Sequence, residues 1–310
     1  MLKTLIKNQY SNTHEEYQYI NLIKDILDQG IEETGRNGKV KQIFGYASIW
    51  SLNDNKIPLL TTKKLAWKTC LKELLFFIRG QTNNKILQDQ NVHIWDGNST
   101  REFLHSRNLS YPEGILGPIY GAQWRHFNAP YDVEKANASA SNNNEQIGGV
   151  DQLQEIINTL KNPDPVVRAS RRLIMTAWNP CQLNEMALPP CHILCQFNVS
   201  SDNKLSLSMY QRSADVLLGM PFNIASYAFL LHLIAHHCGL IADEFVYYVG
   251  NAHIYEQHLE PIKEQIVREP YPWPKLHIRS VRENINDYTI EDFEIIEYKS
   301  HEAIKAQMIA

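Results

Sequence analysis

A thiol and an imidazole stand next to each other in the segment LPPCH at residues 188–192. The two prolines remove two backbone donors and stiffen the chain before a predicted strand, so Cys191 is expected to hold a fixed direction at the strand's edge. A thiol in such a place can be an activated nucleophile. Two alternatives stay open: a half-buried structural cysteine, and metal ligation by Cys181, Cys191, His192 and Cys195, whose spacing matches no common zinc pattern.

Two basic segments could bind an anion. In the segment 211–215, Arg212 offers the forked donor that suits phosphate, and Asp215 could accept from a donor-rich ring. The alternative is a surface salt bridge between these two residues. Arg171 and Arg172 stand beside and at the start of a predicted strand, on which adjacent side chains would point to opposite faces. One of them could reach a ligand or another subunit; the alternative is a solvated pair.

Three further polar residues stand in positions that suit chemistry. His253 and Tyr255 are two apart, so on an extended segment they share a face and could bind a sugar hydroxyl. A hydrogen-bonded core pair is the alternative. Glu73 lies beside Leu74 and Leu75 on a predicted helix, where an unpaired carboxylate is costly to bury. It is therefore expected to be paired or proton-active, unless it is an ordinary exposed glutamate.

The composition narrows the class of protein. The chain has 310 residues, 44% of them hydrophobic, and a net charge of −4. Without clustered excess Lys and Arg, no nucleic-acid or anionic-membrane partner is expected. Five irregularly spaced cysteines indicate free thiols in a reducing compartment. No apolar run approaches the ~18 residues of a membrane span, and the N-terminus lacks signal-peptide features, so a cytoplasmic protein is expected.

The periodicity of apolar residues predicts the elements that position these groups. Residues 34–42 are expected to form a basic, glycine-bearing loop, and 132–149 a polar surface insertion within one domain, 1–310. The irregular alternation of elements indicates an α/β fold of the α+β type, with helices packed on a large mixed sheet. Helices are predicted at 14–31, 64–78, 150–160, 223–238 and 256–267, and strands at 43–52, 172–178, 192–199, 205–209, 245–249 and within 276–296.

Taken together, these motifs resemble thymidylate synthase from about Ile43 to the C-terminus. Their sequences are most similar to those of the eukaryotic and large-virus branch of that family. The resemblance covers most of the chain in order, with family-specific segments. It implies the thymidylate synthase fold. The matching segments are PLLTTKK (58–64), KELLFFIRGQTN (72–83), IWDGN (94–98), LGPIYGAQWRHF (116–127), GVDQLQEII (149–157), RRLIMTAWNP (171–180), MALPPCHILCQF (186–197), YQRSADVLLGMPFNIASYA (210–228), HIYEQHLEPIKEQI (253–266) and IEDFEIIEY (290–298).

The resemblance implies reductive methylation of dUMP to dTMP, with methylene-tetrahydrofolate as co-substrate and no metal. Cys191 would add to carbon six of uracil. The implied catalytic residues are Cys191, Glu73, Tyr120, Asn223 and Asp215. The implied dUMP-binding residues are Arg36, Arg171, Arg172, His192, Gln211, Arg212, Ser213, Asn223, His253 and Tyr255. The implied folate-facing residues are Trp95, Asn98, Asp215, Leu218, Gly219, Phe222 and Ala310 in the closing C-terminal segment.

The resemblance also implies a homodimer, in which Arg171 and Arg172 serve the other subunit's site. Asn223 would favour uracil, because related dCMP hydroxymethylases carry Asp there. The usual phosphate loop reads Arg-Thr-Gly-Thr-Gly, and Arg36 would replace its arginine one position out of register. Three alternatives are a dUMP or dCMP hydroxymethylase on the same fold, a Cys-His hydrolase using Cys191, His253 and Asn251, and a non-catalytic nucleotide-binding protein.

Overall fold

The computed structural model describes residues 2–10, 13–35, 37–138 and 148–309. The chain divides into two compact units, each built from separate stretches of sequence. Unit 1 comprises Met1–Trp67, Phe197–Val281 and Glu291–Ile309, and unit 2 comprises Lys68–Gln196 and Arg282–Ile290.

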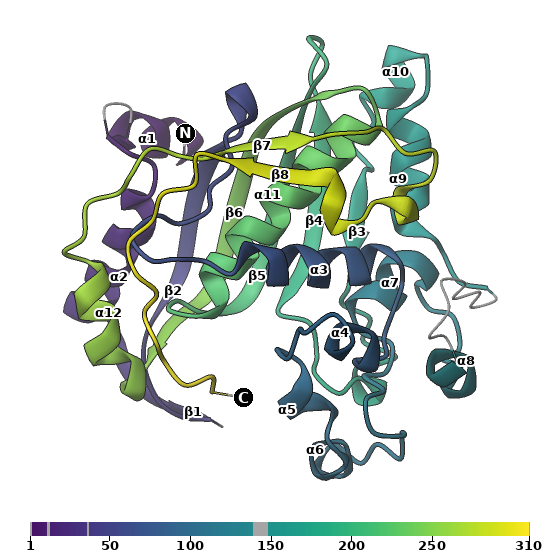
Figure 1. The fold of residues 1–310 in the computed structure, drawn as a ribbon, viewed down its shortest axis with the longest axis horizontal. Helices are drawn as coiled ribbons and strands as arrows, with labels where there is room; N and C mark the ends of the chain where they lie inside the picture. The colour runs from purple at the N-terminus through teal and green to yellow at the C-terminus, as the bar shows by residue number, and fades with distance from the viewer. Residues whose placement is uncertain (1, 11–12, 36, 139–147, 310) are drawn as a thin grey trace. The chain divides into compact units, whose positions relative to one another are not determined.

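The largest element of the fold is a six-stranded mixed sheet in the order β1-β2-β6-β5-β4-β3 (Figure 1). The pairs β1–β2, β2–β6 and β3–β4 are antiparallel, whereas β5–β6 is parallel. The predicted mixed sheet with packed helices is therefore confirmed. The strands are β1 (Ile31–Gly35), β2 (Gly38–Ser51), β3 (Ile174–Thr176), β4 (His192–Val199), β5 (Lys204–Asp215) and β6 (Ile241–Tyr255).

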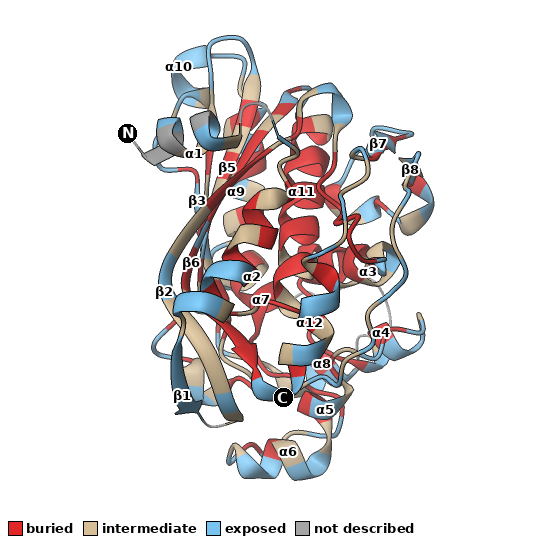
Figure 2. Cartoon of the chain, turned by 90° about the vertical axis from the view of Figure 1, so that its left-hand side faces the viewer, coloured by how far each residue is buried: buried red, intermediate tan, exposed pale blue. Residues whose placement is uncertain are grey.

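In unit 1, helix α11 (Gly219–His237) packs against β5 and β6 (Figure 1). It is buried without interruption from Ile224 to Ala235, as Figure 2 shows by its colour, because its sequence is apolar on nearly all sides. Helix α2 (Tyr17–Gln29) covers β2 with its apolar stripe. Both helices were predicted. Unit 1 also contains α1 (Leu2–Tyr10), α12 (Leu259–Gln265), β7 (Lys275–Ile278) and β8 (Phe293–Ile296).

The prediction of a loop over 34–42 was wrong, because most of this stretch belongs to a β-hairpin. β1 pairs with β2 from Ile31↔Gln42 to Gly35↔Gly38, and Gly38 supplies a φ of 114° at the reversal. The polar residues of this stretch lack the apolar alternation that marks a strand. Pairing of β2 with β6, which reaches Val40↔Tyr255, extends the strand beyond its apolar part.

In unit 2, helix α9 (Gln152–Leu160) packs against α7 (Tyr120–His126) and β3. Asp151 caps α9 by accepting from the backbone N–H of Gln154 at 2.9 Å. Phe127 and Val150 form a β-bridge that closes the base of the predicted insertion. The insertion begins with an unpredicted helix, α8 (Val133–Ala138), and its residues 139–147 lie outside the described part of the chain.

The remaining elements are short, apart from α3 (Trp67–Ile78), which was predicted and is followed by Gly80 at a φ of 71°. Among the described residues, no helix combines the length and apolar character needed to cross a bilayer. The other helices are α4 (Lys85–Gln88), α5 (Asp96–Ser99), α6 (Arg101–Ser106), α10 (Pro165–Arg168) and the 3-10 turns Asn53–Asn55, Leu183–Glu185, Glu256–His258, Ile285–Asp287 and Ile290–Asp292.

Candidate active site

Cys191 lies directly before β4, in the position expected for it. Its thiol forms no disulfide and is half-buried. Its backbone N–H donates to the Tyr120 hydroxyl at 2.7 Å, and Tyr120 is the first residue of α7. This bond ties the start of β4 to a helix more than seventy positions earlier in the sequence. The arrangement holds the thiol at a fixed place without enclosing it in the core.

An aromatic cluster in unit 2 surrounds Tyr120. The ring of His192 stacks on Tyr120 with centroids 4.1 Å apart. The ring of Phe77, on α3, lies 4.9 Å from that of Tyr120, and the two ring planes are tilted by 38°. Trp95 meets Phe77 edge-on at 6.3 Å. Burial lowers the pKa of His192 to about 3, so its imidazole is neutral near pH 7. His192 therefore contributes a ring surface and a neutral donor or acceptor, but no charge.

Glu73 reaches this cluster from α3. The indole Nε1 of Trp95 donates to its Oε1 at 2.7 Å. Burial raises the pKa of Glu73 to about 7, although the Trp95 bond acts in the opposite direction. A carboxyl group with this pKa can both give and take a proton near neutral pH. Glu73 is thus hydrogen-bonded and partly buried, and it is not an ordinary exposed glutamate; its role in proton transfer stays a prediction.

Arg171 and Arg172 are both exposed, and they lie in a turn. The predicted strand 172–178 is shorter than expected, because β3 comprises only Ile174–Thr176. Arg171 and Arg172 therefore lie before the strand, and strand geometry does not direct their side chains to opposite faces. The backbone here is fixed by the Gln196 side chain, which donates to the Arg171 carbonyl at 3.1 Å.

A second group of predicted residues lies in unit 1, at the end of β5 and the start of α11. Tyr247 donates its hydroxyl proton to Gln211 Oε1 at 2.7 Å, and Gln211 Nε2 donates to Asn223 Oδ1 at 3.0 Å. This relay orients the Asn223 amide, leaving its Nδ2 donor and one Oδ1 lone pair for another partner. Asn223 is partly exposed, although most of α11 is buried.

Arg212 and Ser213 are partly exposed on β5. Here β5 lies unusually close to β6, at Gly250. A Cβ added at Gly250 would stand 2.9 Å from the Arg212 carbonyl oxygen and 2.7 Å from the Tyr210 hydroxyl. Only glycine allows this approach without a shift of the backbone. The two strands therefore approach closely at the backbone of Arg212.

Asp215 ends β5 and lies in register with His253 of β6. Its Oδ1 accepts from the backbone N–H of Leu217 at 3.0 Å. The rings of His253 and Tyr255 lie next to each other, as predicted, with centroids 5.0 Å apart. Burial lowers the pKa of His253, while the charge of Asp215 acts to raise it. His253 Nδ1 lies 3.0 Å from Asn251 Oδ1.

Two residues of this group were missed from the sequence. His258 is fully buried, and its Nδ1 lies 3.5 Å from Asp215 Oδ1. Lys63 is buried and its ammonium donates to the Leu217 carbonyl. Burial lowers the pKa of Lys63 to about 8, against the opposing charge of Asp215. The sequence offered one signal for His258: it stands three positions after Tyr255, which was predicted to be in the site.

The remaining predicted residues are placed as follows. Leu218, Gly219 and Phe222 are partly exposed in the first turn of α11 and the residue before it, whereas Trp95 and Asn98 are buried at α5. Arg36 and Ala310 lie outside the described residues. Across the part of the chain that the structure describes, no cluster of three or more His, Cys, Asp or Glu side chains could hold a metal ion.

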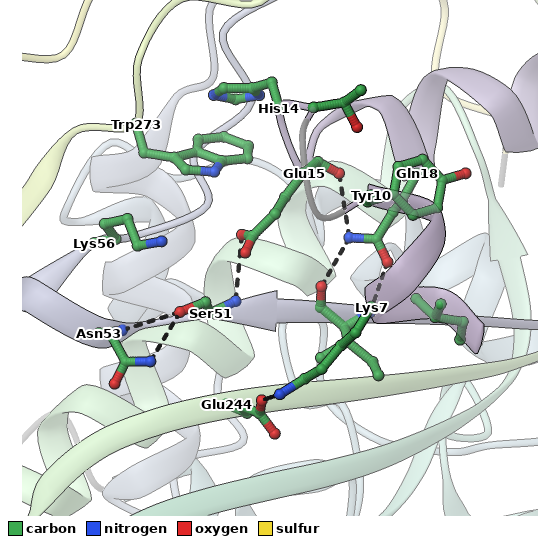
Figure 3. Close-up of a pocket in the computed structure, with 13 residues that line it drawn as sticks. Lys7, Tyr10, His14, Glu15, Gln18, Ser51, Asn53, Lys56, Glu244 and Trp273 are labelled. Carbon is green, nitrogen blue, oxygen red and sulfur yellow. Dashed lines mark hydrogen bonds and ion pairs between the residues drawn. The ribbon is translucent and has the colours of Figure 1, made fainter. Parts of the chain in front are cut away.

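A cavity of about 510 Å³ in unit 1 is separate from the residues predicted above (Figure 3). It is lined by mixed charges, including an ion pair between Lys7 and Glu244. The ring of His14 lies 4.3 Å from that of Trp273 at a tilt of 41°, and burial lowers the pKa of His14 to about 4. The predicted catalytic and binding residues are absent from its described lining.

The family model for thymidylate synthase matches residues 17–310. Human thymidylate synthase is 49% identical over 298 residues, which cover 95% of this chain and 91% of the human protein. Thymidylate synthase 1/2 of Encephalitozoon cuniculi is 46% identical over 301 residues, which cover 96% of this chain and 98% of that protein.

Longer relatives match the same region. The bifunctional dihydrofolate reductase-thymidylate synthase of Leishmania major is 47% identical over 299 residues, which cover 95% of this chain and 55% of that protein. The chain thus spans about half the length of the bifunctional relatives it matches. These matches nonetheless cover nearly all of this chain. The chain belongs to the thymidylate synthase family.

Proposed function

We propose that the chain methylates dUMP to dTMP, with methylene-tetrahydrofolate as co-substrate and dihydrofolate as second product. The observation that carries this proposal is a half-buried Cys191 thiol, outside any disulfide, whose backbone is tied to Tyr120. Family membership supports the same reaction. The hydroxymethylase, hydrolase and non-catalytic alternatives gain no support from the family match.

Cys191 acts in this proposal as the nucleophile. Its thiolate adds to carbon six of the uracil ring, which makes carbon five nucleophilic, and the thiolate leaves again once carbon five is methylated. Bound folate supplies the one-carbon unit and the hydride. Glu73 serves proton transfer in this reaction, and its pKa of about 7 suits that role.

The proposed recognition of dUMP uses charge for the phosphate and an amide for the base. Arg212 and Ser213 provide donors for the phosphate, together with Arg36, Arg171 and Arg172. Gln211 donates to Asn223 Oδ1, so the Asn223 Nδ2 remains available to donate to a ring carbonyl while the second Oδ1 lone pair accepts from a ring N–H. Uracil presents that pair, whereas cytosine has no N–H at the same ring nitrogen.

The folate-facing residues in this proposal include Asp215 and the first turn of α11. Oδ1 of Asp215 already accepts from Leu217, which leaves acceptor capacity on the carboxylate for the N–H groups of a pterin ring. A Cβ at Gly219 would lie 3.7 Å from the Asp215 Cβ, so its absence keeps space beside this carboxylate. This acceptor and the space beside it fit a flat, donor-rich ring.

We further propose a cytoplasmic homodimer in which Arg171 and Arg172 complete the partner's site. Both arginines are exposed. Tyr210 and Tyr248, which are register partners on β5 and β6, are 38% and 39% exposed, and aromatic side chains are common in interfaces. The two units would act as one catalytic domain, because the chain passes between them at 67–68, 196–197, 281–282 and 290–291.

Denaturing mass spectrometry tests the reaction class and the nucleophile together. The protein is mixed with 5-fluoro-dUMP and methylene-tetrahydrofolate, then digested to locate a covalent adduct. We expect the adduct on Cys191, and its loss in Cys191→Ala. Cys181→Ala is the matched control, since Cys181 is an exposed free thiol in the same unit. Turnover of dUMP by Cys191→Ala would overturn the proposal; formation of hydroxymethyl-dUMP without dihydrofolate would instead support the hydroxymethylase.

A further inference from the structure

His258 joins two parts of unit 1 that are far apart in sequence. It directly precedes α12 and is fully buried. Its Nε2 lies 2.8 Å from the carbonyl oxygen of Gln307, near the C-terminus, and its Nδ1 lies 3.5 Å from Oδ1 of Asp215. Figure 1 shows the C-terminal chain running past α12, and Figure 2 shows the same proximity from the side.

The hydrogen bond to Gln307 determines where one imidazole proton must be. A carbonyl oxygen only accepts, so Nε2 of His258 carries a hydrogen. In the neutral ring, Nδ1 then presents a lone pair towards the Asp215 carboxylate, which is repulsive. In the protonated ring, Nδ1 presents an N–H to the same carboxylate, which is attractive. The geometry therefore favours the imidazolium when the C-terminal segment is docked.

The surroundings of His258 act in both directions. Burial lowers its pKa, but the Asp215 carboxylate and the Gln307 carbonyl outweigh burial, and the net pKa lies above the ordinary histidine value. Lys63 lowers the pKa of His258, and His253 is the other imidazole nearby, its own pKa lowered by burial. Tyr255 packs edge-on against the ring at 5.6 Å. Among these groups, only Asp215 carries a negative charge that can attract the His258 imidazolium.

We propose that His258 is a positioning residue whose imidazolium clamps the C-terminal segment to Asp215, so that docking of this segment takes up a proton. Its place in catalysis rests on the proposed function, because Asp215 is assigned there to the folate. The docking itself does not depend on that assignment. A neutral side chain of similar length would keep the bond to Gln307 and lose the attraction to Asp215.

The direction of the pH dependence follows from linkage. Docking fixes a hydrogen on Nε2 of His258, so the pKa of the ring is higher with the segment docked than with it released, and the docked segment is fully stabilised below the pKa of the released state. This stabilisation is lost as the pH rises through the raised pKa of the docked state. Between these two values, the equilibrium constant for release should rise by up to about tenfold per pH unit.

Limited proteolysis measures release without reference to activity. Trypsin cuts after Lys305, which lies in the segment, and mass spectrometry counts the released peptide beginning at Ala306. Rates are divided by those for a free peptide of the same sequence at each pH. We expect the normalised rate of the intact protein to rise with pH. His258→Gln should remove this rise, and His236→Gln should keep it, since His236 also contacts a backbone carbonyl, that of Ser280.

A flat pH profile of the unsubstituted protein would overturn the proposal, and so would an unchanged rise in His258→Gln. If His258→Gln fails to fold, the imidazole pKa of His258 in the intact protein, measured by NMR, decides the question; a value below about 6.5 would contradict us. In the methylation assay, His258→Gln should raise KM for the folate several-fold and leave KM for dUMP unchanged. Loss of methylation in the unsubstituted protein alone would instead refute the proposed function.

Discussion

The protonation of Glu73 gives the most quantitative prediction, because its pKa is raised from 4.5 to about 7 by burial. The folded protein holds this proton more tightly than the unfolded chain does. The free energy of unfolding associated with the group is therefore highest below about pH 4.5 and falls as the pH rises through about 7. Glu73→Gln keeps an acceptor for the Trp95 indole but has no proton to lose.

The magnitude follows from the same two values. The gap between 4.5 and about 7, at about 1.4 kcal/mol per pH unit, corresponds to about 3 kcal/mol. Glu73→Gln should therefore gain stability relative to the unsubstituted protein as the pH rises. Between about pH 5.5 and about pH 8.5, the difference in free energy of unfolding should grow by about 2 kcal/mol.

Urea denaturation at a series of pH values measures this difference. Glu155→Gln is the matched control, because Glu155 is an exposed glutamate on α9 of the same unit. Its effect should not change with pH to a comparable extent. A difference for Glu73→Gln that stays constant from about pH 5.5 to about pH 8.5 would refute the reasoning that burial controls this carboxyl group.

Three further predictions concern other parts of the molecule. Asn223→Asp should shift preference from dUMP towards dCMP, since the carboxyl group can present a proton to the cytosine ring nitrogen; unchanged kcat/KM ratios would contradict this role. Mixed subunits of Cys191→Ala and Arg171→Ala should regain activity that neither variant has alone, and no recovery would count against shared sites. Gly250→Ala should lower the free energy of unfolding by about 1–3 kcal/mol, because its Cβ would stand 2.9 Å from the Arg212 carbonyl oxygen; an unchanged melting temperature would contradict that clash.

The sequence by itself was sufficient for features that depend on short stretches. The uninterrupted apolar character of 223–238 predicted the buried helix α11. The prolines before Cys191 predicted a thiol at a strand's edge, and β4 begins at the next residue. The order of family-specific motifs was enough to indicate the family, which the match over 17–310 confirmed. Each of these features is encoded by residues that are neighbours in the chain.

Only the tertiary structure decided features that depend on residues far apart in sequence. Cross-strand pairing converted the polar stretch near Gly38 into a hairpin, although its composition predicted a loop. Burial raised the pKa of Glu73, and no local pattern specifies how deeply a carboxyl group is enclosed. The contact of His258 with Gln307 joins positions 49 residues apart. Pairing, burial and electrostatic environment are set by which segments meet in space, so periodicity along the chain could not predict them.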